Sequence, residues 1–434
     1  MKPIRKRCNL EEAAGLLYRL GFSFSLLFLL FSSSFVKKLL LDGPAYRLLF
    51  LLPLFFLLLS EALRFLFLRE YRLSDLLSWA LILFSSYLSI RNDQRALIHG
   101  FLLIYGARKQ DIRRLFRIAA ILLTAGAFSV VFLSFSGIIL YQIGEKDGIL
   151  RHSMGFSYPL VLPAYLLTIT MLSLLLLSPQ EEAGGTAVPA GKAGESGPAQ
   201  PLGGWGRLLL TLLLFFNLTV HRWCIGDLSR GMSLLFLLLF LYLSTGFSKK
   251  TEKLLSALDR LSLLSYPLCF LLSLAAAFFY RPGAGGWLGR LNSLLNRRIE
   301  YSQLSLFRYG FGLFSRRISW VGAGTDLNGT AVPGQYDYVD NVYLSVLQRY
   351  GIIFTLLSLL LLFLAMRYCC RRRWRLALYF FALLSFHGLL EDKIYLIEYN
   401  TLLLLIGPAF SEFLEVLRIS VGKKRQKQGY RIRP

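Results

Sequence analysis

The sequence contains few of the residues that form metal sites and disulfide frameworks. Among 434 residues there are 5 cysteines and 4 histidines, and the cysteines show no spacing typical of a metal site. Only one of them, Cys224, is predicted to lie outside the cytoplasm, so no disulfide framework is expected. Acidic residues are also scarce, with 25 Asp and Glu against 49 Lys and Arg. No internal repeat is evident, which weakens the case for a transporter built from inverted repeats.

Apolar residues, in contrast, are abundant. They make up 55% of the chain, with 35 Phe and 22 Tyr, and they recur in runs long enough to cross a hydrocarbon core of roughly 30 Å. Backbone polar groups in lipid must pair within their own segment, so such runs are helices. The sequence predicts an all-α polytopic membrane protein, a single membrane domain over residues 1–434, with about twelve transmembrane helices. The candidate spans are 16–36, 45–61, 74–90, 94–106, 118–136, 159–178, 206–220, 231–247, 262–280, 342–366, 376–390 and 399–417.

The formal charge of +24 could indicate a nucleic-acid partner. The positive-inside rule explains it equally well, because threading the spans alternately from a cytoplasmic N-terminus puts most of the Lys and Arg on the cytoplasmic side. Dense cationic clusters then lie in residues 2–7, 108–117, 367–375 and 418–433. We therefore expect a multi-pass protein of the cell (cytoplasmic) membrane with both termini cytoplasmic. Its expected partner is the lipid bilayer, not nucleic acid.

Two loops differ from the others in composition. Residues 183–204 are rich in Gly, Ala and Pro, show no apolar period, and predict a disordered cytoplasmic loop. Residues 281–341 form a large extracytoplasmic loop, in which Gly and Pro flank an apolar and aromatic stretch with a helical period. This loop is expected to fold as a small helical lobe over the membrane surface.

Polar motifs gather on one side of this topology, the non-cytoplasmic side. Ionisable groups near the membrane are costly and often mark a substrate pathway, so their convergence points to a site. The motifs are Arg151–Pro159, Asp227–Gly231, Asn296–Tyr301, Tyr336–Tyr343, and the group His387, Glu391, Asp392 and Asn400.

Each motif also has a purely structural interpretation. An Arg at a span end often extends to the headgroups, and Asp340-Asn341 before a helix is typical of an N-cap. His387 fits a satisfied buried histidine, or an acid–base group oriented by Glu391 if the helix continues for another turn. The tyrosines of 336–343 fit an interfacial aromatic belt or a platform for sugar rings.

Several arginines at the membrane surface favour an anionic ligand. The guanidinium group is planar and permanently charged, and it matches two phosphate oxygens at once. A lipid-linked diphosphate is the obvious anion at that depth. Since no metal-ligand spacing is present, Arg would itself offset the charge of the leaving group.

Five segments, in order, resemble those of the O-antigen and capsular polysaccharide polymerases (Wzy-type) and the O-antigen ligase superfamily. The similarity covers roughly residues 145–410. It is carried by Arg151–Phe156, Ser229–Gly231, Leu291–Arg298, Tyr338–Leu344 with Tyr350–Ile353, and His387–Glu391 with Asn400.

This resemblance implies a GT-C-like membrane glycosyltransferase that uses no cofactor and no metal ion. Its expected activity is polymerisation of lipid-linked oligosaccharide repeat units. The growing glycan would pass from undecaprenyl diphosphate to a new lipid-linked repeat unit at the outer face of the cytoplasmic membrane. Its expected partners are undecaprenyl-diphosphate-linked oligosaccharides, and it suggests a chain-length regulator and a flippase as well.

The resemblance also assigns candidate residues. The catalytic candidates are His387 with Glu391, or Asp340, any of which would deprotonate the acceptor hydroxyl. Many relatives have His-Pro-Asn where this chain has Tyr158-Pro159-Leu160, so no role is carried onto those positions. The residues expected to bind diphosphate or glycan are Arg151, His152, Ser229, Arg230, Arg298, Tyr301, Asn341 and Tyr343.

Two alternatives remain open at the level of sequence. A ligase, which moves a finished glycan to another acceptor, would show almost the same motifs. A lipid-linked oligosaccharide flippase or transporter belongs to a different class. It should bury charges inside its spans and show symmetry between its halves, whereas most spans here are plain Leu and Phe runs.

Overall fold

The computed structural model describes residues 2–40, 44–68, 71, 73–146, 148–178, 204–244, 249–283, 286–322 and 336–429. Nearly all of the predicted loop 183–204 lies outside these residues. The described chain forms sixteen α-helices and one antiparallel hairpin. The helices are α1 Lys2–Ser32, α2 Val36–Leu40, α3 Pro44–Leu63, α4 Leu73–Arg91, α5 Leu97–Ala107, α6 Ile112–Phe135, α7 Val161–Leu177, α8 Gly204–Cys224, α9 Asp227–Leu243, α10 Lys249–Ser262, α11 Ser265–Phe279, α12 Trp287–Leu294, α13 Arg298–Tyr309, α14 Val342–Arg371, α15 Arg375–His387 and α16 Ile406–Gly429; the strands are β1 Ile143–Lys146 and β2 Ile149–His152.

Several of these helices are long and apolar enough to cross a membrane. Within the described residues there are five such helices, and a sixth if the bent pair α10–α11 is counted as one span. Shorter apolar helices accompany them; α5, with 11 residues, is about 16 Å long and falls short of a roughly 30 Å core. The prediction of an all-helical polytopic membrane protein is therefore confirmed at this level. The count of twelve spans stays a prediction, because an apolar run does not fix the length of the helix that it forms.

The core of the bundle lies around α7. Residues 161–175 of this helix are all buried, and α7 packs against α6, α8 and α9 while α1 packs against α3 and α6. Close approach of backbones is possible where side chains are absent. A Cβ atom at Gly407 of α16 would lie 2.1 Å from the carbonyl oxygen of Ile104 in α5. Small residues serve this role where helices pack in a membrane.

Helix α14 is interrupted at Gly351, whose φ of +85° is outside the helical range. The extended segment 310–316 lies against this kink, where the Ile352 N–H donates to the Gly312 carbonyl at 2.9 Å. A Cβ at position 351 would lie 2.6 Å from the Leu313 carbonyl oxygen. Only glycine fits both the conformation and the contact, so the kink fixes the segment that leads on from α13.

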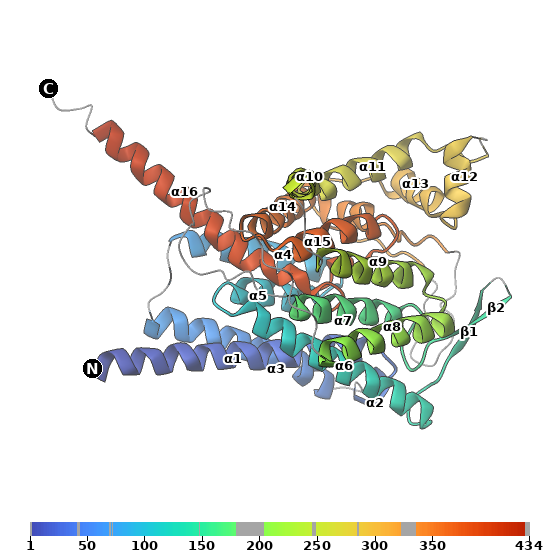
Figure 1. The fold of residues 1–434 in the computed structure, drawn as a ribbon, viewed down its shortest axis with the longest axis horizontal. Helices are drawn as coiled ribbons and strands as arrows, with labels where there is room; N and C mark the ends of the chain where they lie inside the picture. The colour runs from blue at the N-terminus through green and yellow to red at the C-terminus, as the bar shows by residue number, and fades with distance from the viewer. Residues whose placement is uncertain are drawn as a thin grey trace.

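The two ends of the bundle differ. In Figure 1 the first turn of α1 and the last turns of α16 lie to the left, whereas the β1–β2 hairpin and helices α12 and α13 lie to the right. Helices α12 and α13 fall within the predicted lobe 281–341. The hairpin was not predicted from the sequence; its strands are four residues each, too short for alternation to stand out.

The left-hand end of the bundle is held by a buried ionic network. Arg108, which follows α5, donates to both carboxylate oxygens of Glu61 at 3.1 and 2.9 Å, and both side chains are only 7% exposed. Tyr71 donates a further bond of 2.6 Å to Glu61, and the Tyr105 ring lies 3.5 Å below the guanidinium carbon. A buried charge is tolerated only when it is paired in this way, so the network ties α3 to α5.

Removing one member of this pair should destabilise the protein strongly. Glu61→Ala leaves the buried Arg108 charge with Asp75, 3.8 Å away, as its remaining ion partner. This should cost less than the roughly 3–5 kcal/mol of a fully broken buried pair, yet enough to lower the thermal unfolding midpoint of the purified protein in detergent. The double variant Glu61→Leu/Arg108→Leu should recover part of that loss. Arg317→Ala breaks the exposed pair with Asp93 and is the matched control, with little expected change. A Glu61→Ala midpoint equal to that of the control would contradict this account.

Candidate functional site

Charged and tyrosine side chains from four segments meet at the right-hand end of the bundle. Tyr158 precedes α7, Arg298 begins α13, residues 336–341 precede α14, and the loop 388–400 follows α15. We name this group the polar cluster. Its members are Tyr158, Arg298, Tyr336, Tyr338, Asp340, Glu391, Asp392 and Lys393.

Asn341 joins two of these segments. Its side-chain oxygen accepts from the Tyr343 and Leu344 N–H groups, so it is the N-cap of α14. Its amide nitrogen donates to the Leu389 carbonyl at 3.2 Å and to Ser273 Oγ at 2.9 Å. The structural interpretation of Asn341 is thus confirmed. The cap also holds the neighbouring Asp340 beside the loop that carries Glu391.

Arg298 and Asp340 form the ion pair at the centre of the polar cluster. Arg298 Nε donates to Asp340 Oδ2 at 3.1 Å, and the two side chains are 22% and 26% exposed. Tyr336 donates to the same oxygen at 3.2 Å, and the Tyr301 ring packs edge-on against Tyr336. Burial and the nearby Glu391 raise the pKa of Asp340, although Arg298 and Tyr336 oppose that shift. The pair is therefore accessible, and its carboxylate is more basic than usual.

Two consecutive residues before α13 adopt a left-handed backbone conformation, and Arg298 follows them. Asn296 and Arg297 both adopt positive φ, at 53° and 63°, which is uncommon for residues other than glycine. Because of this turn, the side chains of Arg297 and Arg298 bond different partners. Arg297 bonds Glu300 on its own helix, whereas Arg298 reaches Asp340 across the cluster.

Lys393 is a cluster residue that sequence reasoning did not single out. Its ammonium lies 3.9 Å from Glu391 Oε1 and 5.5 and 5.9 Å from the ring centroids of Tyr158 and Tyr399. Its side chain is 24% exposed. Partial burial would lower the pKa of Lys393, but attraction to Glu391 outweighs this and raises it, so the side chain is cationic. The adjacent charges in Glu391-Asp392-Lys393 were a signal that could have found it.

Arg349 and Tyr158 were also missed. Arg349 lies inside the predicted span 342–366, yet its guanidinium carbon lies 4.4 and 5.7 Å from the rings of Trp320 and Tyr338. Tyr158 received no role because its motif departs from the family pattern. In the structure its pKa is raised by burial, with Lys393, Arg151, Asp340 and Glu391 all within electrostatic range. Tyr158 therefore occupies the middle of the cluster.

The hairpin brings Arg151 towards this cluster and His152 away from it, as neighbouring strand residues point to opposite faces. Arg151 acts electrostatically on Tyr158, and its buried Nε has no hydrogen-bond partner among the described residues. His152 bonds the Tyr141 hydroxyl through Nδ1 at 2.8 Å and packs against Trp223. Of the two, Arg151 is the one placed to meet a ligand in the cluster.

Ser229 and Arg230 lie in the first turns of α9. Ser229 is buried, and Arg230 pairs with Asp227 of its own helix at 2.7 Å while remaining 35% exposed. The contacts described here therefore do not place either residue in the polar cluster. Tyr343 is buried and donates to the Ser385 carbonyl at 2.7 Å, which is a packing contact between α14 and α15.

His387 is the last residue of α15 and is buried. Because the helix ends there, Glu391 does not follow it on the same helix face, and that conditional expectation was wrong. Gly388 turns the chain; a Cβ at this position would lie 2.6 Å from Ile394 Cδ1 and 2.7 Å from Val342 Cγ1. His387 remains within electrostatic range of Glu391 and Arg298, and its Nδ1 has no partner in the described part of the chain.

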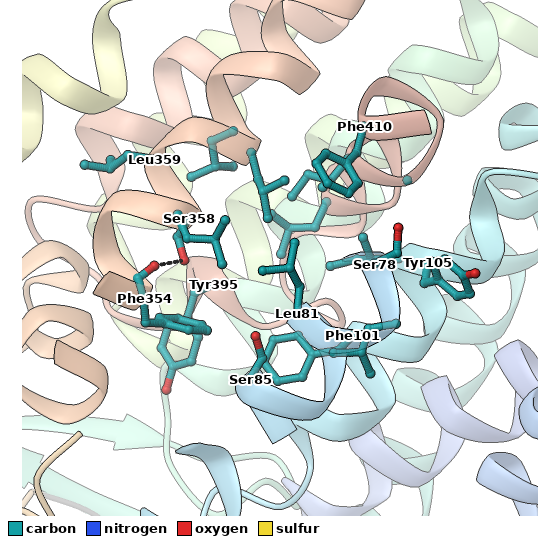
Figure 2. A pocket seen from close by; sticks show the side chains of 18 of the residues that line it. Ser78, Leu81, Ser85, Phe101, Tyr105, Phe354, Ser358, Leu359, Tyr395 and Phe410 are labelled. Carbon is teal, nitrogen blue, oxygen red and sulfur yellow. Dashed lines mark hydrogen bonds between the residues drawn. The ribbon is translucent and has the colours of Figure 1, made fainter. Parts of the chain in front are cut away.

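An apolar cavity of about 350 Å³ adjoins the cluster. It runs between α4, α5, α14 and α16, and Figure 2 shows aromatic and leucine side chains around it. At the end next to the polar cluster it is lined by Ile394, Tyr395 and Asn400. The described residues contain no group of three His, Cys, Asp or Glu arranged to hold a metal ion. The charged residues in its lining are Asp75, Arg108, Lys109, Glu415 and Arg418, and the cluster reaches it through Ile394 and Tyr395, which follow Lys393 in the chain.

Asp392 should make stability depend on pH. Burial and Glu391 raise its pKa to about 7. The hydrogen bond donated by Tyr338 and the positive charges of Lys393 and Arg349 oppose this shift. The folded state then binds more protons than the unfolded chain between pH about 4 and about 7, so stability falls as pH rises through that window. Thermal unfolding from pH 5 to 8 should show this fall. Asp392→Asn should flatten it and Asp227→Asn, an exposed control, should not; equal slopes in all three proteins would contradict the assignment.

Comparisons of the chain with protein-family models, with curated proteins and with solved structures found no match. The site is therefore defined by its own geometry: a partly exposed Arg–Asp pair, a partly exposed lysine and several tyrosines that contact these charges.

Proposed function

We propose that the protein polymerises lipid-linked oligosaccharide repeat units by transferring a growing glycan from undecaprenyl diphosphate to a new lipid-linked unit. The observation that carries the proposal is the accessible Arg298–Asp340 pair with Lys393 close by; residues that follow the cluster in the chain, Val342, Ile394 and Tyr395, line an apolar cavity. A lipid-linked diphosphate has the matching form, with an anionic head and a long apolar body. The family resemblance of the sequence supports the same substrate class.

The cations of the cluster would bind the diphosphate. Arg298 offers a planar fork that fits phosphate oxygens, and Lys393 adds a compact charge. Arg151 approaches from the hairpin with an unpartnered buried Nε. Arg230, which the sequence also suggested, pairs with Asp227 in this structure and would have to exchange that partner to take part.

Diphosphate binding would also prepare the base. When phosphate oxygens take Arg298, Asp340 loses the guanidinium that lowers its pKa, and its carboxylate becomes a better proton acceptor. Asp340 then takes the proton of the acceptor hydroxyl as that oxygen attacks the anomeric carbon. The bond from this carbon to the diphosphate oxygen breaks, and the lipid diphosphate leaves with negative charge offset by Arg298, Arg151 and Lys393.

Among the three catalytic candidates, Asp340 suits the base best. It is the most exposed of them and already bonds the residue proposed to hold the leaving group. Glu391 would act as the partner that keeps Lys393 charged and in place. His387 is buried behind the cluster and would influence it through its field.

The proposal places the cluster at the non-cytoplasmic face of a twelve-span, GT-C-like protein in the cytoplasmic membrane. The last turns of α16 lie at the opposite end of the bundle from α12 and α13 (Figure 1), so a cluster beside α13 would face away from the cationic C-terminal segment, in keeping with the positive-inside rule. A ligase would use the same cluster with a different acceptor, so it remains the nearest alternative.

Substitution of Arg298 tests the proposal most directly. With purified protein in liposomes and lipid-linked repeat units as substrate, Arg298→Ala should abolish the ladder of longer glycans, because the diphosphate loses the cation that binds it and offsets its charge as it leaves. Arg298→Lys should restore only part of the activity, since lysine lacks the fork. The control Arg297→Ala, at the neighbouring exposed residue that pairs with Glu300, should extend chains normally.

Two outcomes would count against the role of Arg298. Normal ladders from Arg298→Ala would remove the residue from diphosphate binding. Equal loss in Arg297→Ala and Arg298→Ala, with both proteins folded, would indicate damage to the α12–α13 lobe rather than loss of a specific contact, and would count against the role of Arg298.

A further inference from the structure

Helix α10 carries an apolar face that no described residue covers. Leu254, Leu258 and Leu261 are 68%, 44% and 64% exposed. Their spacing of four and three residues puts them on one side of the helix. Three large aliphatic side chains in one exposed stripe are unfavourable in water, so this stripe calls for an apolar environment.

A neighbouring face, one residue further round the helix from the leucine stripe, fixes α10 to the bundle. Leu255, Asp259 and Ser262 are buried, and Arg375 at the start of α15 makes two bonds to Glu252, of 2.9 and 2.6 Å, and one of 3.0 Å to Asp259. Both acidic side chains of the helix therefore point to Arg375. The exposed cations Lys253 and Arg260 border the remaining surface.

The direction of α10 also differs from that of a spanning helix. It joins α11 through a two-residue turn with a bend of 53°, and α11 itself exposes Leu268, Leu271 and Leu272. The exposed Leu264 in the turn continues the apolar surface from one helix to the other. An apolar stripe bordered by Lys and Arg, at an angle to the neighbouring span, is the pattern of a helix that lies in a membrane interface.

We propose that α10 is an in-plane anchor that binds the anionic leaflet of the membrane at the end of the bundle opposite the polar cluster. Leu254, Leu258 and Leu261 lie among the upper parts of the lipid chains. Lys253 and Arg260 bind anionic headgroups, and Arg375 holds the helix at that depth. The inference is independent of the proposed glycan chemistry, because none of these residues belongs to the polar cluster.

The depth of α10 can be measured in the full-length protein. An environment-sensitive fluorescent amino acid at position 258, in nanodiscs of phosphatidylcholine and phosphatidylglycerol, should be quenched most by lipids brominated near the headgroup. The same probe at Ser256, outside the leucine stripe, should be quenched much less. Strongest quenching at 258 by bromine near the chain ends would show that α10 is part of a span, and equal weak quenching at both positions would show that it faces water or a protein; either result overturns the proposal.

The charge preference provides a second measurement. Headgroup attraction of about 1 kcal/mol per cation predicts that Lys253→Gln and Arg260→Gln each reduce the retention of phosphatidylglycerol over phosphatidylcholine by about fivefold. These side chains are exposed, so the fold should survive. The control Arg290→Gln, an exposed cation of α12 at the other end of the bundle, should leave the preference unchanged. No loss in either α10 variant would overturn the electrostatic part of the proposal.

Discussion

The Arg298–Asp340 ion pair is the contact on which the arrangement of the candidate site depends. It links the first residue of α13 to the residue before the N-cap of α14, two positions that the intervening chain alone does not hold together. Asn341, next to Asp340, ties the same point to the loop after α15. Glu391, Asp392 and Lys393 are thereby brought beside the pair. Charged groups at this depth need partners. Without a ligand, the charged residues of the polar cluster pair with one another.

At each end of the bundle, charged side chains need partners, but the two ion pairs differ in how exposed they are. At one end, Glu61 and Arg108 are almost completely enclosed and their hydrogen bonds are made within the protein. At the other, Arg298 and Asp340 are partly open, with side chains that are 22% and 26% exposed. An enclosed, satisfied pair stabilises the packing of helices. An open pair can exchange one partner for a substrate phosphate, which is why we assign chemistry to this end.

The sequence predicted the helical membrane class, because hydropathy is summed over long segments. The side of the membrane on which the polar motifs lie stays a prediction. It also identified Asn341 as a possible cap, since capping is decided within a few residues. It could not predict that Arg298 would meet Asp340 or that Arg349 would lie between Trp320 and Tyr338, because these contacts join distant segments. In the sequence alone, Lys393 looks like an ordinary cation between two spans and Arg349 like a single cation within one. His387 and Glu391 would share a helix face only if one helix continued through both, and α15 ends at His387.

The central claim is that this protein lengthens glycans on a lipid carrier. The most direct measurement is the size of the carrier-linked and surface glycans in cells that lack the gene, compared with cells in which it is restored. The account predicts single repeat units on the carrier and on the surface, with long chains returning on restoration. Full-length chains held on the carrier would instead indicate a ligase, and intermediates trapped on the cytoplasmic side a flippase; either result would contradict the account.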